Sequence, residues 1–136
     1  MRVLIADDDR VYVRMVSNYL KEWGLDSIAV YDGVQTMMFA GRTKPDLILL
    51  DISMPAGNGF EVLKNLKASS GTGRIPVVVV TGSVELAAER KVLEGGAVAF
   101  MRKPPDMSKL YEVICRVLGI PGEPSPKQGL STPEVS

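Results

Sequence analysis

The fold is decided by the stretch Leu47-Ile48-Leu49-Leu50-Asp51-Ile52-Ser53-Met54-Pro55. Four aliphatic residues lead directly into a carboxylate, and a proline follows soon after it. A short apolar run bounded by a turn signal indicates a strand that is buried on both faces of a parallel sheet. Asp51 is then at the carboxyl end of that strand, the edge of an open α/β sheet where ligands bind. Taken alone, an aspartate after a strand is as readily a turn former or a helix N-cap.

The composition is that of one ordinary globular domain. The chain has 136 residues, 46% hydrophobic and 24% charged, and 16 basic and 16 acidic residues give a formal net charge of zero. This balance argues against direct nucleic-acid binding, which needs a basic excess on at least one face. The single cysteine, Cys115, cannot form an internal disulfide, and the lack of histidine excludes histidine ligands and bases.

The N-terminus does not have the pattern of a targeting segment. The acidic Asp7 comes too early for the apolar region of a signal peptide. No apolar run approaches the roughly 20 residues that a membrane span needs. We therefore expect a soluble cytoplasmic protein with no membrane partner.

Five strand-like segments alternate with five helix-like segments. The expected strands are residues 3–6, 28–30, 46–50, 75–80 and 97–101. The expected helices are residues 10–23, 34–42, 60–68, 84–93 and a last one capped by Asp106 or Ser108. This alternation predicts an α/β fold, a doubly wound five-stranded parallel sheet with right-handed crossovers and helices on both faces. Residues 119–136 are rich in Pro, Gly and Ser, so we expect a domain at 1–118 followed by a flexible tail or linker.

Polar side chains capable of chemistry stand at the carboxyl ends of several strands: Asp7, Asp8, Asp51, Thr81 and Lys103. Three clustered carboxylates repel one another and raise each other's pKa unless a hard cation such as Mg²⁺ holds them ionised. A lysine and a hydroxyl suit phosphoryl oxygens, and an aspartate can itself accept a phosphoryl group as an acyl phosphate. The residues therefore indicate a magnesium-assisted phosphoryl acceptor with Asp51 as the acceptor.

Each of these residues also has a simpler interpretation. The run Asp7-Asp8-Asp9 could be helix capping and solvated charge, and we expect Asp9 to be an N-cap. Thr81 alone is more typical of a helix cap, and Lys103 alone of a surface lysine. Their joint placement at the matching ends of alternate elements favours a shared site.

Five motifs together resemble the receiver domain of two-component response regulators over roughly residues 1–118. They are Leu4 to Asp9, Asp51 to Pro55, Gly57 to Leu63, Val80 to Gly82, and Arg102 to Pro104. The resemblance implies the flavodoxin-like (βα)5 topology with strand order 2-1-3-4-5. In that order the first and third strands are neighbours, so Asp7 and Asp8 are expected beside Asp51.

The resemblance also implies roles in phosphorelay signalling. Asp51 is expected to take the phosphoryl group from a histidine kinase or a phosphotransfer protein. Asp8 is expected to bind Mg²⁺ directly and Asp7 often through water, with Asp51 and the backbone carbonyl of Ser53 completing the protein ligands. Lys103 and Thr81 are each expected to bind a phosphoryl oxygen. The Lys103–Pro104 peptide is expected to be cis. Such a domain is no enzyme, since it promotes only its own phosphorylation and dephosphorylation.

Switching is expected to follow from a movement of Thr81 toward the phosphoryl group. Phe100 matches the switch aromatic of the family and would rotate into the space that Thr81 vacates. This would remodel the face made by residues 84–93, residues 97–101 and the last helix, and so control a downstream protein partner or a missing output domain. The alternative for Phe100 is an ordinary core aromatic.

Some positions depart from common members of the family. Val98-Ala99 stand where two acids often contribute to a charged dimer face, which puts the salt-bridged form of a homodimer in doubt. The last helix instead offers a stripe of Tyr111, Cys115 and Leu118, either a partner surface or extra core contact. Ser53 and Ser83 occupy positions that tune phosphoryl lifetime, and both are short and uncharged. We therefore expect slow self-dephosphorylation.

Three other functions compete. A phosphohydrolase of the haloacid dehalogenase type needs a second aspartate two residues after the nucleophile, where this chain has Ser53. A dinucleotide-binding domain needs a glycine-rich turn after the first strand, where acids stand here. A degenerate receiver that only binds partners stays an alternative, although the intact set of acids argues against it.

Overall fold

The computed structural model describes residues 1–54 and 59–121. The Gly57-Asn58 motif and most of the predicted tail lie outside the described residues. The strands are β1 (Arg2–Ala6), β2 (Asp26–Val30), β3 (Leu47–Leu50), β4 (Val77–Thr81) and β5 (Ala99–Arg102). The helices are α1 (Arg10–Glu22), α2 (Gly33–Thr43), α3 (Gly59–Ala68), α4 (Ala88–Glu94) and α5 (Met107–Leu118). None of these helices is long and apolar enough to cross a membrane.

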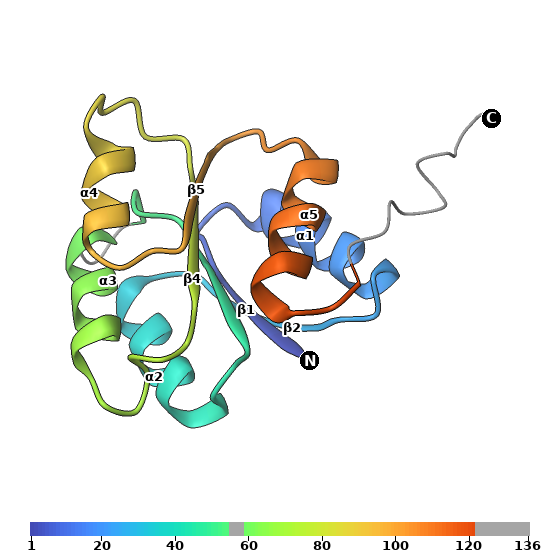
Figure 1. The fold of residues 1–136 in the computed structure, drawn as a ribbon, viewed down its shortest axis with the longest axis horizontal. Coiled ribbons are helices and arrows are strands. Elements are labelled where there is room, and N and C mark those ends of the chain that lie inside the picture. The colour runs from blue at the N-terminus through green and yellow to red at the C-terminus, as the bar shows by residue number, and fades with distance from the viewer. Residues whose placement is uncertain (55–58, 122–136) are drawn as a thin grey trace. The chain divides into compact units, whose positions relative to one another are not determined.

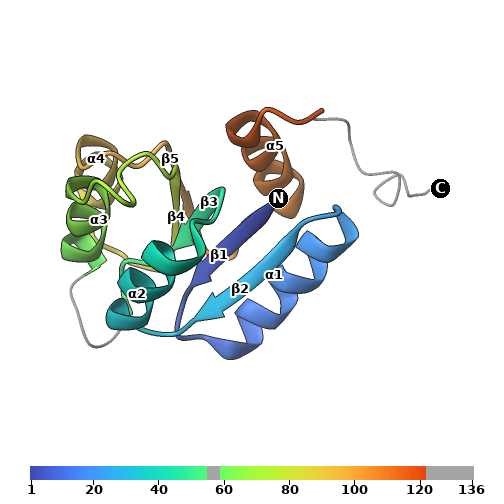
Figure 2. The ribbon, with the colours of Figure 1, turned by 90° about the horizontal axis from the view of Figure 1, so that it is seen from below.

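The chain divides into two compact units, Met1–Lys103 and Pro104–Ser136. The first contains the whole sheet, and every strand pair in it is parallel. Figure 1 shows the elements along the chain. The strand order is β2-β1-β3-β4-β5, which can be followed in Figure 2, where all five strands are labelled. The expected five-stranded parallel sheet with order 2-1-3-4-5 is confirmed.

Helices of the first unit cover both faces of the sheet. α2, α3 and α4 lie on one face and α1 lies on the other, as Figure 2 shows. Alternate strand residues point to opposite faces, so each strand buries side chains against both helix layers. One layer is formed around Leu4, Ile48, Leu50, Val77 and Val79 together with the helix residues Val62, Leu66 and Val92. Fully burying each such side chain contributes about 1.5–3 kcal/mol, which is why the apolar runs fix the strands.

The first two helices begin at aspartate N-caps. The Asp9 carboxylate accepts a hydrogen bond from the Tyr12 N–H and begins α1, as expected. Asp32 does the same for Gln35 at the start of α2. α1 ends before Gly24, whose φ of 81° lies in the left-handed region that glycine adopts at little cost.

α3 approaches the end of β3 very closely at its first residue. A Cβ built on Gly59 would lie 2.1 Å from the Cα of Ile52. The Gly59 N–H also donates to the Ile52 carbonyl over 3.2 Å. A glycine is therefore required where α3 begins, directly behind the segment that carries Asp51.

Several expected boundaries were wrong. The predicted helix 84–93 begins only at Ala88, because local hydrogen bonds compete with helix formation in the preceding loop: Ser83 N–H donates to Thr81 Oγ1, and Glu85 N–H donates to Ser83 Oγ. β4 begins at Val77 and not at Ile75, since Pro76 has no N–H for a sheet ladder. β5 begins at Ala99 and not at Ala97, because the Ala97 N–H donates a hydrogen bond to the Val92 carbonyl at the end of α4.

The second unit contains α5. Its N-cap is Asp106, which accepts hydrogen bonds from the N–H groups of Ser108 and Lys109. Of the two expected caps, Asp106 is therefore the correct one. Gly119 ends the helix with a φ of 71°.

Candidate functional site

The sheet register brings two of the predicted carboxylates side by side. β1 and β3 are neighbours with Ala6 opposite Leu50, so Asp7 and Asp51 follow paired residues. The Asp51 N–H donates to the Ala6 carbonyl over 2.9 Å, which extends the pairing to the edge of the sheet. Both aspartates are only 2% exposed. Two acids buried this deeply need compensating donors.

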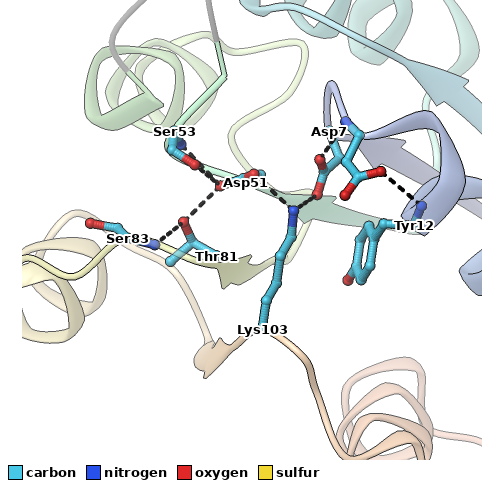
Figure 3. Close-up of polar contacts among 8 residues, drawn as sticks. Asp7, Tyr12, Asp51, Ser53, Thr81, Ser83 and Lys103 are labelled. Atoms are coloured by element: carbon cyan, nitrogen blue, oxygen red, sulfur yellow. Dashed lines mark hydrogen bonds and ion pairs between the residues drawn. The ribbon is translucent and has the colours of Figure 1, made fainter.

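Lys103 supplies positive charge to both carboxylates. Its Nζ lies 2.6 Å from Oδ2 of Asp7 and 3.1 Å from Oδ2 of Asp51 (Figure 3). The lysine follows β5 directly, and its N–H donates to the Thr81 carbonyl over 2.9 Å. Residues from the ends of β1, β3, β4 and β5 thus meet at one edge of the sheet.

The other oxygen of Asp51 accepts three hydrogen bonds. Thr81 Oγ1 donates to Oδ1 over 2.7 Å, and Ser53 donates both its N–H (2.9 Å) and its Oγ (2.8 Å). The two oxygens therefore have different environments, since Oδ1 faces neutral donors and Oδ2 faces the Lys103 ammonium. Ser53 was expected to act through its backbone carbonyl, and its hydroxyl contact was missed.

Thr81 is linked to β5 through the β4–α4 loop. The Ser83 N–H donates to Thr81 Oγ1 over 3.1 Å, and Nη1 of Arg102 donates to the Ser83 carbonyl over 2.6 Å. The Arg102 guanidinium also lies 5.0 Å from the centroid of the Phe100 ring. Phe100 is partly buried and packs against the core. A continuous chain of contacts therefore joins Asp51 to the aromatic residue expected to switch.

Burial and hydrogen bonding act in opposite directions on the site's pKa values. Burial tends to raise the pKa of Asp51, but hydrogen bonds from Thr81 and Ser53 and the charge of Lys103 lower it below its ordinary value. Burial raises the pKa of Asp7, and the hydrogen bond from Lys103 offsets this only in part. Burial tends to lower the pKa of Lys103, yet its contacts with Asp7 and Asp51 raise it. Of Asp7 and Asp51, Asp51 is therefore the carboxylate more firmly held in its ionised form.

The acids have the geometry of a cation site. Asp7, Asp8 and Asp51 each offer a carboxylate oxygen, and these oxygens lie within 4.8 Å of one another. Asp8 is exposed, which leaves one side of the cluster open to solvent. Hard oxygen donors with room for water ligands are the set that Mg²⁺ prefers, so the residues fit this ion.

Two further residues at the site, Tyr12 and Arg102, were not predicted. The Tyr12 ring lies beneath Lys103, with 4.4 Å between Nζ and the ring centroid. A weak signal was available for each residue. Tyr12 is in the first helical turn after the acidic run, and Arg102 immediately precedes Lys103.

Comparison with known families agrees with this geometry. Residues 3–115 match the family model of the response regulator receiver domain. Receiver domains are signalling modules of two-component systems, generally without enzymatic activity toward other molecules. They bind Mg²⁺ at an acidic pocket and interact with histidine kinases and output domains.

Individual relatives give the same answer. The chain is 31% identical to the polar-differentiation response regulator DivK of Brucella anthropi, covering 86% of this chain and 95% of DivK. It is 34% identical to the DNA-binding response regulator MtrA of Mycolicibacterium paratuberculosis, covering 85% of this chain but only 49% of MtrA. The receiver domain of a signal transduction histidine kinase from Syntrophus aciditrophicus is 29% identical and superimposes with a TM-score of 0.80, covering 87% of this chain and 89% of that one. By fold, site geometry and sequence, the chain belongs to the response regulator receiver domains.

Proposed function

We propose that this chain accepts a phosphoryl group on Asp51 from a histidine kinase or a phosphotransfer protein, with Mg²⁺ as cofactor. One observation carries the proposal: the buried Asp51 contacts Lys103 and Thr81 and lies beside two further acids at one edge of the sheet. Each of these groups is of little use without the others. Together they provide a nucleophile, donors for phosphoryl oxygens and a cation site.

The transfer step uses the free electron pair of the Asp51 carboxylate. One carboxylate oxygen attacks phosphorus, and the P–N bond to the donor imidazole breaks. The imidazole nitrogen keeps the electron pair of that bond and takes a proton from solvent, while Asp51 becomes an acyl phosphate. The lowered pKa of Asp51 keeps it deprotonated for the attack.

Asp7, Asp8, Asp51 and the Ser53 carbonyl would hold Mg²⁺. The ion, when bound, neutralises the clustered carboxylates and the charge of the phosphoryl oxygens. In the structure, Lys103 forms ion pairs with Asp7 and Asp51. Once the charge of the two carboxylates is neutralised, the Lys103 ammonium can bind a phosphoryl oxygen. The Thr81 hydroxyl can bind another phosphoryl oxygen on the other side of Asp51.

Thr81 and Phe100 would report the phosphorylation. A Thr81 hydroxyl that moves from Asp51 to a phosphoryl oxygen alters its contact with Ser83, which Arg102 connects to β5. We propose that this changes the packing of Phe100 and the surface of α4 and β5, which a protein partner or an output domain would recognise.

The test uses beryllofluoride, a stable mimic of the phosphoryl group. Amide spectra of the parent chain and of Asp51→Ala are recorded with Mg²⁺ alone and with Mg²⁺ plus beryllofluoride. We expect shifts around Asp51, Thr81 and Phe100 in the parent, and no beryllofluoride response in Asp51→Ala. Shifts that need neither Mg²⁺ nor Asp51, or no response in the parent, would leave a degenerate receiver that acts only by binding proteins.

A further inference from the structure

Lys103 has a third partner besides the two carboxylates. Its Nζ lies 4.4 Å from the centroid of the Tyr12 ring, within the range of a cation–π contact. Figure 3 shows the ring beside the lysine head, on the side away from Ser53 and Thr81. The ammonium therefore lies among two carboxylates and an aromatic face.

The acidic loop itself positions Tyr12. The Asp9 N–H donates to Oδ1 of Asp7 over 3.0 Å, and Oδ1 of Asp9 accepts the Tyr12 N–H over 3.1 Å. The same short segment thus fixes the Asp7 carboxylate and the first turn of α1 that carries the ring. The ring's place beside Lys103 is set by the backbone of the site.

The hydroxyl of Tyr12 does not explain its presence. This oxygen is buried and has no hydrogen-bond partner among residues 1–54 and 59–121. Burial and the nearby carboxylates raise the pKa of Tyr12, so the phenol stays neutral. An unpaired buried hydroxyl costs stability, and what the residue contributes to the site is the face of its ring.

We propose that Tyr12 is a positioning residue that retains the Lys103 ammonium at the site while the ammonium exchanges carboxylate partners for a phosphoryl oxygen. This inference rests on the proposed function. A lysine has a long flexible stem and three donors, and the structure directs two of them to Asp7 and Asp51. These two contacts weaken when a cation claims the carboxylates.

A ring face attracts an ammonium whichever way its N–H groups point. The attraction of Tyr12 therefore persists while the hydrogen bonds of Lys103 are rearranged. Without the ring, the lysine head can extend into solvent during the exchange. The phosphoryl group would then be bound less tightly, although the cation ligands are intact.

The test compares Tyr12→Phe, which keeps the ring, with Tyr12→Leu, which keeps apolar bulk without an aromatic face. Two quantities are measured by titration: the affinity for Mg²⁺ alone, and the affinity for beryllofluoride at saturating Mg²⁺. We expect Tyr12→Phe to match the parent in both. We expect Tyr12→Leu to keep its Mg²⁺ affinity within about twofold and to lose about tenfold in beryllofluoride affinity.

The chemical shift of the Lys103 ε-methylene protons gives a readout that a purely structural role would not move. The ring should shift these protons upfield in the parent and in Tyr12→Phe, with and without beryllofluoride, but not in Tyr12→Leu. The proposal is overturned if the upfield shift is lost when beryllofluoride binds. It is also overturned if beryllofluoride affinity is equal in all three proteins, or if both variants lose beryllofluoride affinity equally. A parent that ignores beryllofluoride while showing the upfield shift instead rejects the proposed function and leaves the contact itself established.

Discussion

Nη1 of Arg102 donates a 2.6 Å hydrogen bond to the backbone carbonyl of Ser83, and so fastens the β4–α4 loop to the end of β5. The Ser83 N–H in turn donates to Thr81 Oγ1. In Arg102→Ala the loop loses this tie, worth about 1 kcal/mol for an exposed charged donor. We expect about fivefold faster hydrogen exchange at the Ser83 amide, measured by NMR.

The matched control for that experiment is Arg90→Ala. Arg90 is exposed on α4 and is not the donor to the Ser83 carbonyl. Its removal should leave the exchange rate of the Ser83 amide unchanged. Equal rates in Arg102→Ala and in the parent would show that the loop does not depend on Arg102.

Gly59→Ala should destabilise the fold severely. The added methyl would lie 2.1 Å from Cα of Ile52, so α3 and the end of β3 must separate. We expect a loss of at least about 3 kcal/mol in the free energy of unfolding, measured with urea. Gly41→Ala is the control, because a methyl at this exposed position in α2 meets nothing within 4 Å. It should gain about 0.5–1 kcal/mol, and a similar loss in both variants would contradict the steric argument.

Asp7→Asn should stabilise the protein at neutral pH. Burial raises the folded-state pKa of Asp7 above 3.8, so the folded state binds the proton more tightly than the unfolded state does. The ionised group therefore costs stability, fully above its folded pKa and not at all below the unfolded one. We expect the variant to gain on the order of 1 kcal/mol at pH 7, with the gain disappearing by about pH 3.

Urea unfolding across this pH range measures the effect, with Asp8→Asn as the control. Asp8 is exposed, so its variant should stay within about 0.5 kcal/mol of the parent. A gain for Asp7→Asn that is the same at pH 3 and pH 7 would exclude ionisation as its cause.

The acyl phosphate of the parent should decay slowly. Ser53 and Ser83 have short, uncharged side chains that cannot direct a water at phosphorus. Both hydroxyls are also engaged, since the Ser53 hydroxyl donates to Asp51 and Ser83 Oγ accepts from the Glu85 N–H. Ser53→Asn and Ser83→Glu should each accelerate decay by about tenfold. Loss of label after removal of a radioactive small-molecule phosphodonor gives the rates. A parent that already decays as fast as the variants contradicts the prediction.

Much of the fold could be read from the sequence because its signals are local. The apolar runs that end at Ala6, Leu50 and Val80 specify strands buried on both faces, and their alternation with helices specifies a parallel sheet. Parallel strands present their carboxyl ends at one edge. This rule alone predicts that Asp51, Lys103 and Thr81 lie close together.

The remaining features depend on contacts that no local pattern encodes. The late start of α4 results from hydrogen bonds of Thr81 and Ser83 with the loop backbone, which a periodicity argument cannot detect. Tyr12 and Arg102 gain their significance only from where the tertiary fold places Lys103 and Ser83.

The contact of Gly59 with Ile52 also bears on how variation in this chain should be interpreted. In a library of all single substitutions, position 59 should be depleted by a screen for protein abundance. Small substitutions at position 51, such as Asn, should be depleted less by that screen than substitutions at position 59, and should fail a screen for signalling. Residues 51 and 59 are close in sequence but would be intolerant of substitution for different reasons. The two screens together would separate a residue required for folding from one required for signalling.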